Sequence, residues 1–468
     1  MLDFVNKYLL GVTVPILLIC VGIYFTLYLR GFHIFKTAKI FKILIKKKTP
    51  EGISPFRALT LALAGTLGVG NIVGVSAAIA VGGFGSVFWM WISALCAMVL
   101  KYAEVVLAMR HRRVDDDGSL HGSAMYYIND VFSHIHLKKT GALLSSVFAL
   151  FCLMNALTMG GMIQSNAVSE ALNGVFNITP IACGAIISLL IFLIISIGSK
   201  MISKLTEILV PLMSVGYIVI SLAVIIIRRE AVPEALMSIF KDAFSAKAAL
   251  GGGLGFIFSN ALRYGCMRGL ISNEAGCGTA PMAHSAPSSN SPAEQGVYGI
   301  VEVFVDTILL CTMTALVVII NYDGINTDIG WLMMTFEAYK NTLGEFAVIF
   351  LAISVLCFGF ATILCWGHYG TEAMKYFSKK KISKRLFIIA YSVSVFSGAV
   401  FASELIWSLA DLAIGAMSVI NITVLLIGKK EIKEETDYYF FAENKNKYNK
   451  NSKNAKNITK SVDKSKTL

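Results

Sequence analysis

The sequence predicts an all-α polytopic membrane protein with about eleven transmembrane helices. Of its 468 residues, 56% are hydrophobic and only 15% are charged, a balance typical of chains that cross a bilayer repeatedly. Apolar segments of about 20 residues, the length that a helix needs to cross the hydrocarbon, alternate with short polar connections. A transmembrane β-barrel would instead show segments of about 10 residues with alternating polarity, a pattern that the sequence lacks.

The basic residues predict how these segments are oriented. Lys and Arg gather in every second connection, as in the residues from Arg30 to Lys48 and from Arg110 to Arg113. Because basic connections stay in the cytoplasm, we expect a plasma-membrane protein with its N-terminus outside and its C-terminus in the cytoplasm. These connections explain the net charge of +12 better than nucleic acid does. The expected spans are residues 8–29, 56–80, 84–109, 142–168, 180–198, 205–227, 249–272, 297–320, 345–372, 385–402 and 404–427.

The second span contains a glycine-rich stretch, residues 64–80, which reads AGTLGVGNIVGVSAAIA. Glycine weakens a helix by about 1 kcal/mol relative to alanine, yet unpaired backbone groups are costly in hydrocarbon. The stretch is therefore either a close helix–helix contact or a broken helix whose freed backbone binds something. In the second case the carbonyl groups of Ala64, Gly65 and Gly68 and the amide of Asn71 are candidate ligands for a cation and for the ends of a zwitterion.

A second irregular stretch opens the seventh span, with glycines at 251–253, 255, 265 and 269. If the first span is peripheral, the two irregular spans open two groups of five, a layout that points to the binding site of an inverted-repeat transporter. The expected divisions are residues 1–54, with a peripheral span and a basic interfacial helix; 55–228, the first repeat; 229–428, the second repeat with an external amphipathic segment; and 429–468, a basic cytoplasmic tail expected to be disordered.

Several polar side chains inside the spans are candidate ligands, because their burial in a membrane is costly. Thr362 and Trp366 lie four residues apart on one helix face, where the hydroxyl suits sodium and the indole suits a small pocket wall. Gln164 lies on the fourth span. For Thr362 the alternative is a hydrogen bond to the backbone of its own helix, and for Gln164 it is an interhelical hydrogen bond.

Charged residues inside the spans allow two interpretations. Asp306 and Asp411 are deep enough to accept a proton or attract a cation, whereas an ion pair of Asp306 with Arg263 or Arg268 would be structural. Lys101 and Glu104 are three residues apart and are expected to pair with each other. Because the sequence contains no nucleophile elbow, P-loop, HExxH or paired-cysteine motif, we expect neither an enzyme nor a cofactor.

Six long motifs resemble the alanine/glycine:cation symporter family of the amino acid-polyamine-organocation superfamily, also called sodium:alanine symporters. The family's glycine and Trp-Met-Trp signature is found at 82–95 as GGFGSVFWMWISAL. The other motifs are GTLGVGNIVGV at 65–75, KYAEVVLAMRHR at 101–112, GSAMYYI at 122–128, RGLISNEAGCGTAP at 268–281 and ATILCWGHYGTE at 361–372. At Val69, Cys365 and His368 the sequence differs from the residues that are usual in the family.

The resemblance implies a leucine-transporter-like fold, an inverted five-plus-five repeat with one extra N-terminal helix. It also implies an amino acid pocket formed by Gly68, Gly70, Asn71, Gln164, Thr362 and Trp366, and a sodium site formed by Ala64, Gly65, Gly68 and Thr362. The expected function is sodium-coupled import of alanine, glycine or D-alanine through the lipid bilayer. The alternatives are a glutamine- or proton-coupled transporter of the same fold and a channel.

Overall fold

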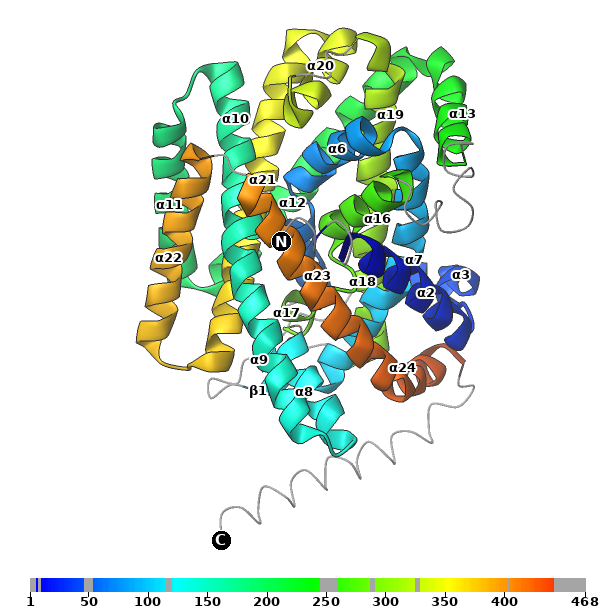
Figure 1. The fold of residues 1–468 in the computed structure, drawn as a ribbon, viewed down its shortest axis with the longest axis vertical. Coiled ribbons are helices and arrows are strands. Elements are labelled where there is room, and N and C mark those ends of the chain that lie inside the picture. The colour runs from blue at the N-terminus through cyan, green and yellow to red at the C-terminus, as the bar shows by residue number, and fades with distance from the viewer. Residues whose placement is uncertain are drawn as a thin grey trace.

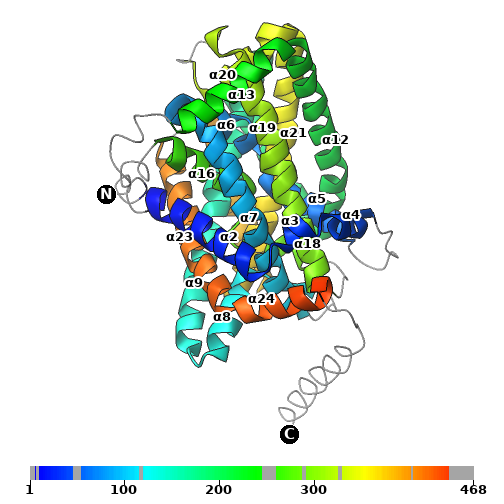
Figure 2. The same ribbon diagram turned by 90° about the vertical axis from the view of Figure 1, so that its right-hand side faces the viewer.

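The computed structural model describes residues 6, 10–45, 54–114, 120–244, 260–286, 291–324, 329–401 and 404–441. Figures 1 and 2 show an elongated bundle of helices, with α13 and α20 at one end and α8 and α24 at the other. The helices as far as residue 227 are α2 (Gly11–Tyr28), α3 (Phe32–Phe35), α4 (Thr37–Ile45), α5 (Pro55–Thr66), α6 (Val73–Gly82), α7 (Gly85–Arg110), α8 (Ala124–His134), α9 (Lys138–Asn155), α10 (Gln164–Phe176), α11 (Pro180–Ile197) and α12 (Ser199–Ile227).

The later helices are α13 (Val232–Ala243), α16 (Asn260–Asn273), α17 (Pro281–His284), α18 (Pro292–Val303), α19 (Thr312–Ile320), α20 (Trp331–Leu343), α21 (Glu345–Phe377), α22 (Lys381–Val400), α23 (Glu404–Ile427) and α24 (Lys429–Thr436). Three short 3-10 turns are η2 (Val69–Asn71), η4 (Arg229–Ala231) and η6 (Tyr322–Gly324), and three π-helical segments are η3 (Ala156–Ile163), η5 (Phe304–Cys311) and η7 (Asp437–Phe441). Strand β1 (Arg113–Val114) pairs antiparallel with β2 (Leu120–His121).

The number of spans is close to the expected eleven. Within the described residues, nine helical segments are long and apolar enough to cross a membrane, and the bent pair of α5 and α6 makes ten. The seventh expected span begins among residues outside the described ranges, and its described part, α16, has 14 residues. The prediction of a multi-pass helical membrane protein is confirmed.

Three helices begin at signals that are visible in the sequence. Pro55, Pro180 and Pro292 each occupy the first turn of a helix, where the missing N–H costs nothing. The residue before each proline is Ser or Thr, and its hydroxyl accepts a hydrogen bond from a backbone N–H of the first turn. Such caps stabilise a helix end by about 1 kcal/mol.

The glycine signature before α7 has a packing explanation. Gly83 has a φ of 78°, which is favourable only for glycine, and a side chain at Gly85 would overlap the backbone of Ala243 in α13. The carboxylate of Asp242 accepts the N–H of Gly85 at 2.7 Å, so it neutralises the positive end of α7. The motif therefore joins α7 to the amphipathic helix α13.

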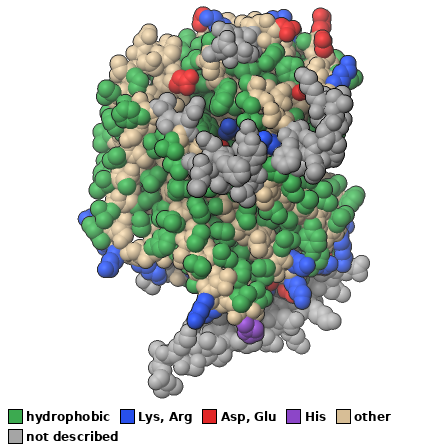
Figure 3. Space-filling model, in the orientation of Figure 1, with side chains coloured by type: hydrophobic (Ala, Val, Ile, Leu, Met, Phe, Trp, Pro, Cys, Tyr) green, Lys and Arg blue, Asp and Glu red, His purple; other side chains and the backbone are tan. Residues whose placement is uncertain are grey.

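Figure 3 shows how side chains are distributed on one face of the bundle. Hydrophobic side chains cover the middle, Lys and Arg gather at the lower end, and both acidic and basic side chains occur at the upper end. A hydrophobic middle with polar ends is what a bilayer requires of a spanning protein. The face therefore agrees with a bundle that spans the membrane along its long axis.

The structure corrects the expectation for the start of the tail and adds helices between the expected spans. Residues 429–441 are helical in α24 and η7, and Ile432 and Phe440 are buried. Arg110 holds this segment through Glu431 at 3.3 Å and Glu434 at 3.2 Å. The rest of the expected disordered tail lies outside the described residues. Helices α8 and α20 lie between the expected spans, where the sequence analysis assigned no element.

Candidate functional site

The glycine-rich stretch is a broken helix. Helix α5 ends at Thr66, and the axis turns by 61° before α6. The N–H of Val69 donates to the side-chain oxygen Oε1 of Gln164 at 3.0 Å. The break therefore replaces a helical hydrogen bond with one from a residue of another span, and this favours the broken helix over the close-packing interpretation.

Gly68 lies at the point where three segments meet. A Cβ atom at this position would lie 2.8 Å from Oε1 of Gln164 and 2.9 Å from the hydroxyl oxygen of Thr362. Because real Cβ atoms do not approach other atoms this closely, only glycine fits without displacing its neighbours. The structure therefore brings Gly68, Gln164 and Thr362 together, as the sequence analysis expected.

The hydroxyl of Thr362 lies between two helices. It is 2.9 Å from the carbonyl oxygen of Ala64 and 3.0 Å from that of Phe358 in its own helix. It is also 3.5 Å from the carbonyl oxygen of Leu67, at the break. The expected backbone bond within the helix and the expected approach to the broken helix are therefore both present.

The remaining expected sodium ligand, Gly65, lies one residue beyond Ala64 in α5. A Cβ atom there would lie 3.0 Å from the sulfur of Cys365 and 3.2 Å from the hydroxyl of Tyr369. The missing side chain thus lets α5 approach α21 closely. The negative end of the α5 half-helix and its freed carbonyl groups suit a cation, and the positive end at η2 and α6 suits a carboxylate.

Asn71 belongs to a second polar cluster, on the α16 side of the break. Its side-chain N–H donates to Asp306 at 2.7 Å and to Ser272 at 3.0 Å. Ser272 in turn donates to the other carboxylate oxygen of Asp306 at 2.8 Å. The oxygen Oδ1 of Asn71 is buried without a hydrogen-bond partner, which leaves it free to accept a hydrogen bond from a ligand.

The partners of Asp306 correct one interpretation of the sequence. Among the described residues its partners are Asn71, Ser272 and Thr307 rather than Arg263 or Arg268. Asp306 lies in the π-helical segment η5, and Gln164 directly follows the π-helical segment η3. Because a π-helical segment leaves backbone groups out of register, it is frequently found at functional sites.

Within the described residues, a second break follows α16. Helix α16 continues through Gly265 and Gly269, both of which pack against α7, and ends at Asn273. The chain then has positive φ at Glu274, Gly276 and Gly278 before α17. The glycines at 251–253 and 255 lie outside the described residues. The break thus comes from the NEAGCGTA stretch rather than from the glycines of α16.

Trp366 connects α21 to this second break. Its indole N–H donates to Oε1 of Glu274 at 3.1 Å, and Thr279 donates to Oε2 of Glu274 at 2.6 Å. A side chain at Gly160 would overlap the indole. Sequence reasoning missed Glu274, although an acidic residue just before two closely spaced glycines, in an otherwise apolar region, was a usable signal.

Buried charged side chains of α7 lie next to the second break. Lys101 pairs with Glu302 at 3.0 Å, and the expected pair of Lys101 with Glu104 is wrong. Glu104 instead accepts the N–H of Gly278 at 3.0 Å and the amide of Asn421 at 2.6 Å. Residues three apart on a helix are close enough to pair, but here the backbone donor at the break is available to Glu104.

Of the two remaining expected residues, Gly70 lies at the first break and Asp411 lies elsewhere. Gly70 lies in η2, next to Gly68, and a Cβ atom there would meet only the Cα of Ser272, at 3.9 Å. Asp411 lines a separate cavity between α2, α16 and α23. The structure therefore does not bring Asp411 to the site formed at the first break.

The chain matches the sequence profile of the sodium:alanine symporter family over residues 1–455. It is 37% identical to an uncharacterised transporter of Haemophilus influenzae over 443 residues, which are 94% of this chain and 95% of the relative. It is 34% identical to the sodium/alanine symporter AgcS of Methanococcus maripaludis, with 93% and 96% covered. It is 32% identical to the probable sodium/glutamine symporter GlnT of Bacillus subtilis, with 90% and 87% covered.

A solved structure shares the fold. The crystal structure of MhsT in complex with L-phenylalanine matches 83% of this chain and 93% of its own, with a TM-score of 0.61 and 14% sequence identity. At this identity the similarity concerns the fold alone. The prediction of a leucine-transporter-like fold is confirmed.

Proposed function

The chain belongs to the sodium:alanine symporter family, and we propose that it couples inward sodium movement to the uptake of alanine or glycine. The observation that carries this proposal is the contact of the Thr362 hydroxyl with the carbonyl oxygen of Ala64, at 2.9 Å. It places a side-chain oxygen of α21 against freed backbone oxygens of the first broken helix. Unwound backbone carbonyls and half-helix ends are how broken-helix transporters coordinate sodium.

The proposed sodium ligands are the carbonyl groups of Ala64, Gly65 and Gly68 and the hydroxyl of Thr362. The carbonyl oxygen of Leu67, 3.5 Å from that hydroxyl, is a further ligand that the structure supports. All are uncharged oxygens, which suit a hard cation. Because α5 and α21 supply different ligands, a bound sodium ion would hold the two helices together.

The proposed amino acid site lies beside the sodium site, at Gly68, Gly70, Asn71, Gln164, Thr362 and Trp366. The free Oδ1 of Asn71 would accept a hydrogen bond from the ammonium group, and the N-terminal turn at η2 would face the carboxylate. The indole of Trp366, fixed by Gly160 and Glu274, would limit the side chain to a small one.

Coupling in this proposal needs no covalent step. Sodium and the amino acid would bind best to the state in which α5, α21 and the second break are drawn together. Their binding would therefore shift the population toward that closed state. The closed bundle would then open to the other side of the membrane.

A glutamine substrate or proton coupling is the second candidate, because one relative is named as a probable sodium/glutamine symporter and Asp306 is a buried carboxylate. Uptake of labelled alanine into proteoliposomes with an inward sodium gradient tests both. We expect alanine uptake that stops when potassium replaces sodium and that excess glycine inhibits. Uptake unaffected by sodium but driven by a pH gradient, or inhibited only by glutamine, would support the second candidate instead.

A further inference from the structure

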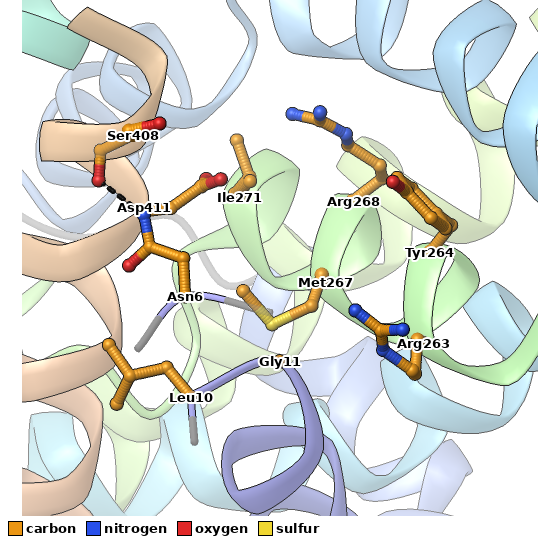
Figure 4. A pocket seen from close by; sticks show the side chains of 10 residues that line it. All are labelled: Asn6, Leu10, Gly11, Arg263, Tyr264, Met267, Arg268, Ile271, Ser408 and Asp411. Atoms are coloured by element: carbon orange, nitrogen blue, oxygen red, sulfur yellow. Dashed lines mark hydrogen bonds between the residues drawn. The ribbon is translucent and has the colours of Figure 1, made fainter. Parts of the chain in front are cut away.

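A cavity of about 220 Å³ lies between the extra N-terminal helix α2, the second broken helix α16 and α23. Figure 4 shows Arg263 and Arg268 projecting from α16, and Asp411 from α23, around this space. Leu10 and Gly11 of α2 form another wall. The cavity is separate from the cluster of Gly68, Gln164 and Thr362.

The charged groups of the cavity have unsatisfied atoms. Nε of Arg263, Nη1 of Arg268 and Oδ1 of Asp411 are buried without a hydrogen-bond partner. Among the described residues, no ion pair links either arginine to Asp411 or to another carboxylate. Two guanidinium groups and one carboxylate therefore line one small cavity without a direct salt bridge between them in the described residues. Buried polar groups left in this state need an explanation, and a bound ligand, ion or water molecule would supply their missing partners.

The surroundings of Arg268 hold its guanidinium group in place. It lies 5.2 Å from the ring of Trp407 and 5.8 Å from that of Trp331, within the range of cation–π attraction. A Cβ atom at Gly74 in α6 would lie 3.9 Å from the Cδ of Arg268. The guanidinium group of Arg268 thus lies between aromatic rings of α20 and α23.

The wall formed by α2 is also fixed. The side-chain amide of Asn6, just before α2, donates to the backbone carbonyl of Ser408 in α23 at 2.7 Å, as the dashed line in Figure 4 shows. A side chain at Gly11 would come within 3.4 Å of the Arg263 guanidinium group. The start of the extra helix therefore lies beside Arg263 and closes one side of the cavity.

We propose that this cavity is a second, outer binding site for an α-amino acid zwitterion. Arg263 and Arg268 would bind the carboxylate, and Asp411 would bind the ammonium group. The volume is below the roughly 300–1,000 Å³ of sites for drug-sized ligands, which suits a small amino acid. This inference rests on the proposed function in that both sites take the same kind of substrate.

The outer site is adjacent to the central one. Ile271 lines the cavity, and the next residue, Ser272, donates to Asp306 beside Asn71. Gly74, at which an added Cβ atom would lie 3.9 Å from the Cδ of Arg268, follows Asn71 by three residues. Occupation of the outer site would thus precede transfer to the neighbouring central site.

Equilibrium binding of labelled alanine to the purified full-length protein, with and without sodium, tests this proposal. Gly68→Ala should weaken alanine binding at the central site at least tenfold by overlap, and we expect this variant to keep one alanine site per chain whose affinity is independent of sodium. Gly68→Ala combined with Asp411→Asn should lose that binding at least tenfold. No alanine binding by Gly68→Ala, or unchanged binding by the double variant, would overturn the proposal.

Competition by ligands with one charge separates recognition from a structural effect. For Gly68→Ala we expect alanine to bind at least tenfold more tightly than propionate or alanine amide. In the double variant the preference for alanine over propionate should disappear, because only Asp411 distinguishes them. An unchanged preference would contradict the assignment. A failure of the proposed function is a separate result: it would be the absence of sodium-dependent uptake by wild-type proteoliposomes.

Discussion

The hydroxyl of Thr362 lies 2.9 Å from the carbonyl oxygen of Ala64, although 298 residues separate them in the chain. One atom belongs to a continuous helix and the other to a helix that breaks three residues later. A hydroxyl that already contacts a freed carbonyl needs little movement to share a cation with it. This contact joins the two groups of helices at the proposed sodium site.

Substitution of Thr362 should mainly change the sodium dependence of alanine uptake. Thr362→Val keeps the shape but removes the oxygen, so we expect the sodium concentration for half-maximal uptake to rise at least tenfold, about 1.4 kcal/mol. Thr362→Ser keeps the oxygen and should stay within a few-fold of wild type. Sodium titration of alanine uptake in proteoliposomes measures both. An unchanged titration for Thr362→Val would remove this residue from the site.

The two glycines of the first break should respond differently to alanine. At Gly68 a Cβ atom would lie 2.8 Å from Gln164 and 2.9 Å from Thr362, whereas at Gly70 it would meet only Ser272, at 3.9 Å. We expect Gly68→Ala to reduce uptake at least tenfold through an overlap of about 1–3 kcal/mol. Gly70→Ala should have a much smaller effect. Equal effects of the two changes would contradict the geometry of the break.

The indole of Trp366 and the carboxylate of Glu274 should be energetically coupled. Trp366→Phe keeps the ring against Gly160 but leaves a buried oxygen of Glu274 without its donor, at a cost of about 1–3 kcal/mol. In a Glu274→Met background this cost should largely vanish. A double-mutant cycle on alanine affinity measures the coupling. Additive effects of the two substitutions would show that the contact does not contribute to binding.

The buried pair of Lys101 and Glu302 should be important for stability. Both side chains are almost fully buried, with 0% and 1% exposed. Lys101→Met removes the cation beside Oε1 of the buried Glu302 and leaves only His284, 3.0 Å from Oε2, so we expect a loss of about 3–5 kcal/mol. Lys101→Met with Glu302→Gln should recover part of the loss. Thermal unfolding in detergent measures the three melting temperatures, which should fall from wild type to the double variant to Lys101→Met. A melting temperature of Lys101→Met equal to that of wild type would contradict the prediction.

A pH-dependent contact joins α7, α8 and α24 beyond the end of the α7 span. Burial disfavours a charged ring at His111, but hydrogen bonds to Asp130 at 3.1 Å and to Glu431 at 2.9 Å outweigh burial and raise the pKa of His111 above its ordinary value of 6.5. The same contacts hold the pKa of Asp130 and of Glu431 below their ordinary values.

The raised pKa determines the sign of the effect. The stabilisation by His111 is complete below about pH 6.5 and is lost as the pH rises through the raised pKa. The stabilisation by the two carboxylates is lost only when the pH falls through their lowered pKa values, well below pH 6.5. We expect the melting temperature of wild type to approach that of His111→Gln between pH 6.5 and 9. The exposed His136 serves as a control, because His136→Asn should leave the pH dependence unchanged. A constant difference between wild type and His111→Gln would contradict the prediction.

Sequence reasoning named most residues of the proposed central site because glycines and polar residues inside apolar spans are costly and therefore conspicuous. Gly68, Gln164 and Thr362 do meet, and Asn71 and Trp366 lie on either side of them, at the second polar cluster and at the second break. Glu274 was missed because its importance depends on where α16 ends. That end is determined by positive φ at Glu274, Gly276 and Gly278, not by the glycines inside α16, which serve helix packing.

The sequence by itself determined that the chain is a multi-pass helical membrane protein, that its second span is irregular, and which family it resembles. These features depend on apolar length, local glycine density and long motifs, all of which are local properties. Only the tertiary structure decided which charges meet. Lys101 pairs with Glu302 rather than Glu104, and Asp306 is held by Asn71 rather than by an arginine. The physical reason is that a charge buried away from water needs a polar partner close by. Which partner is close depends on how the helices pack, and here it comes from another helix.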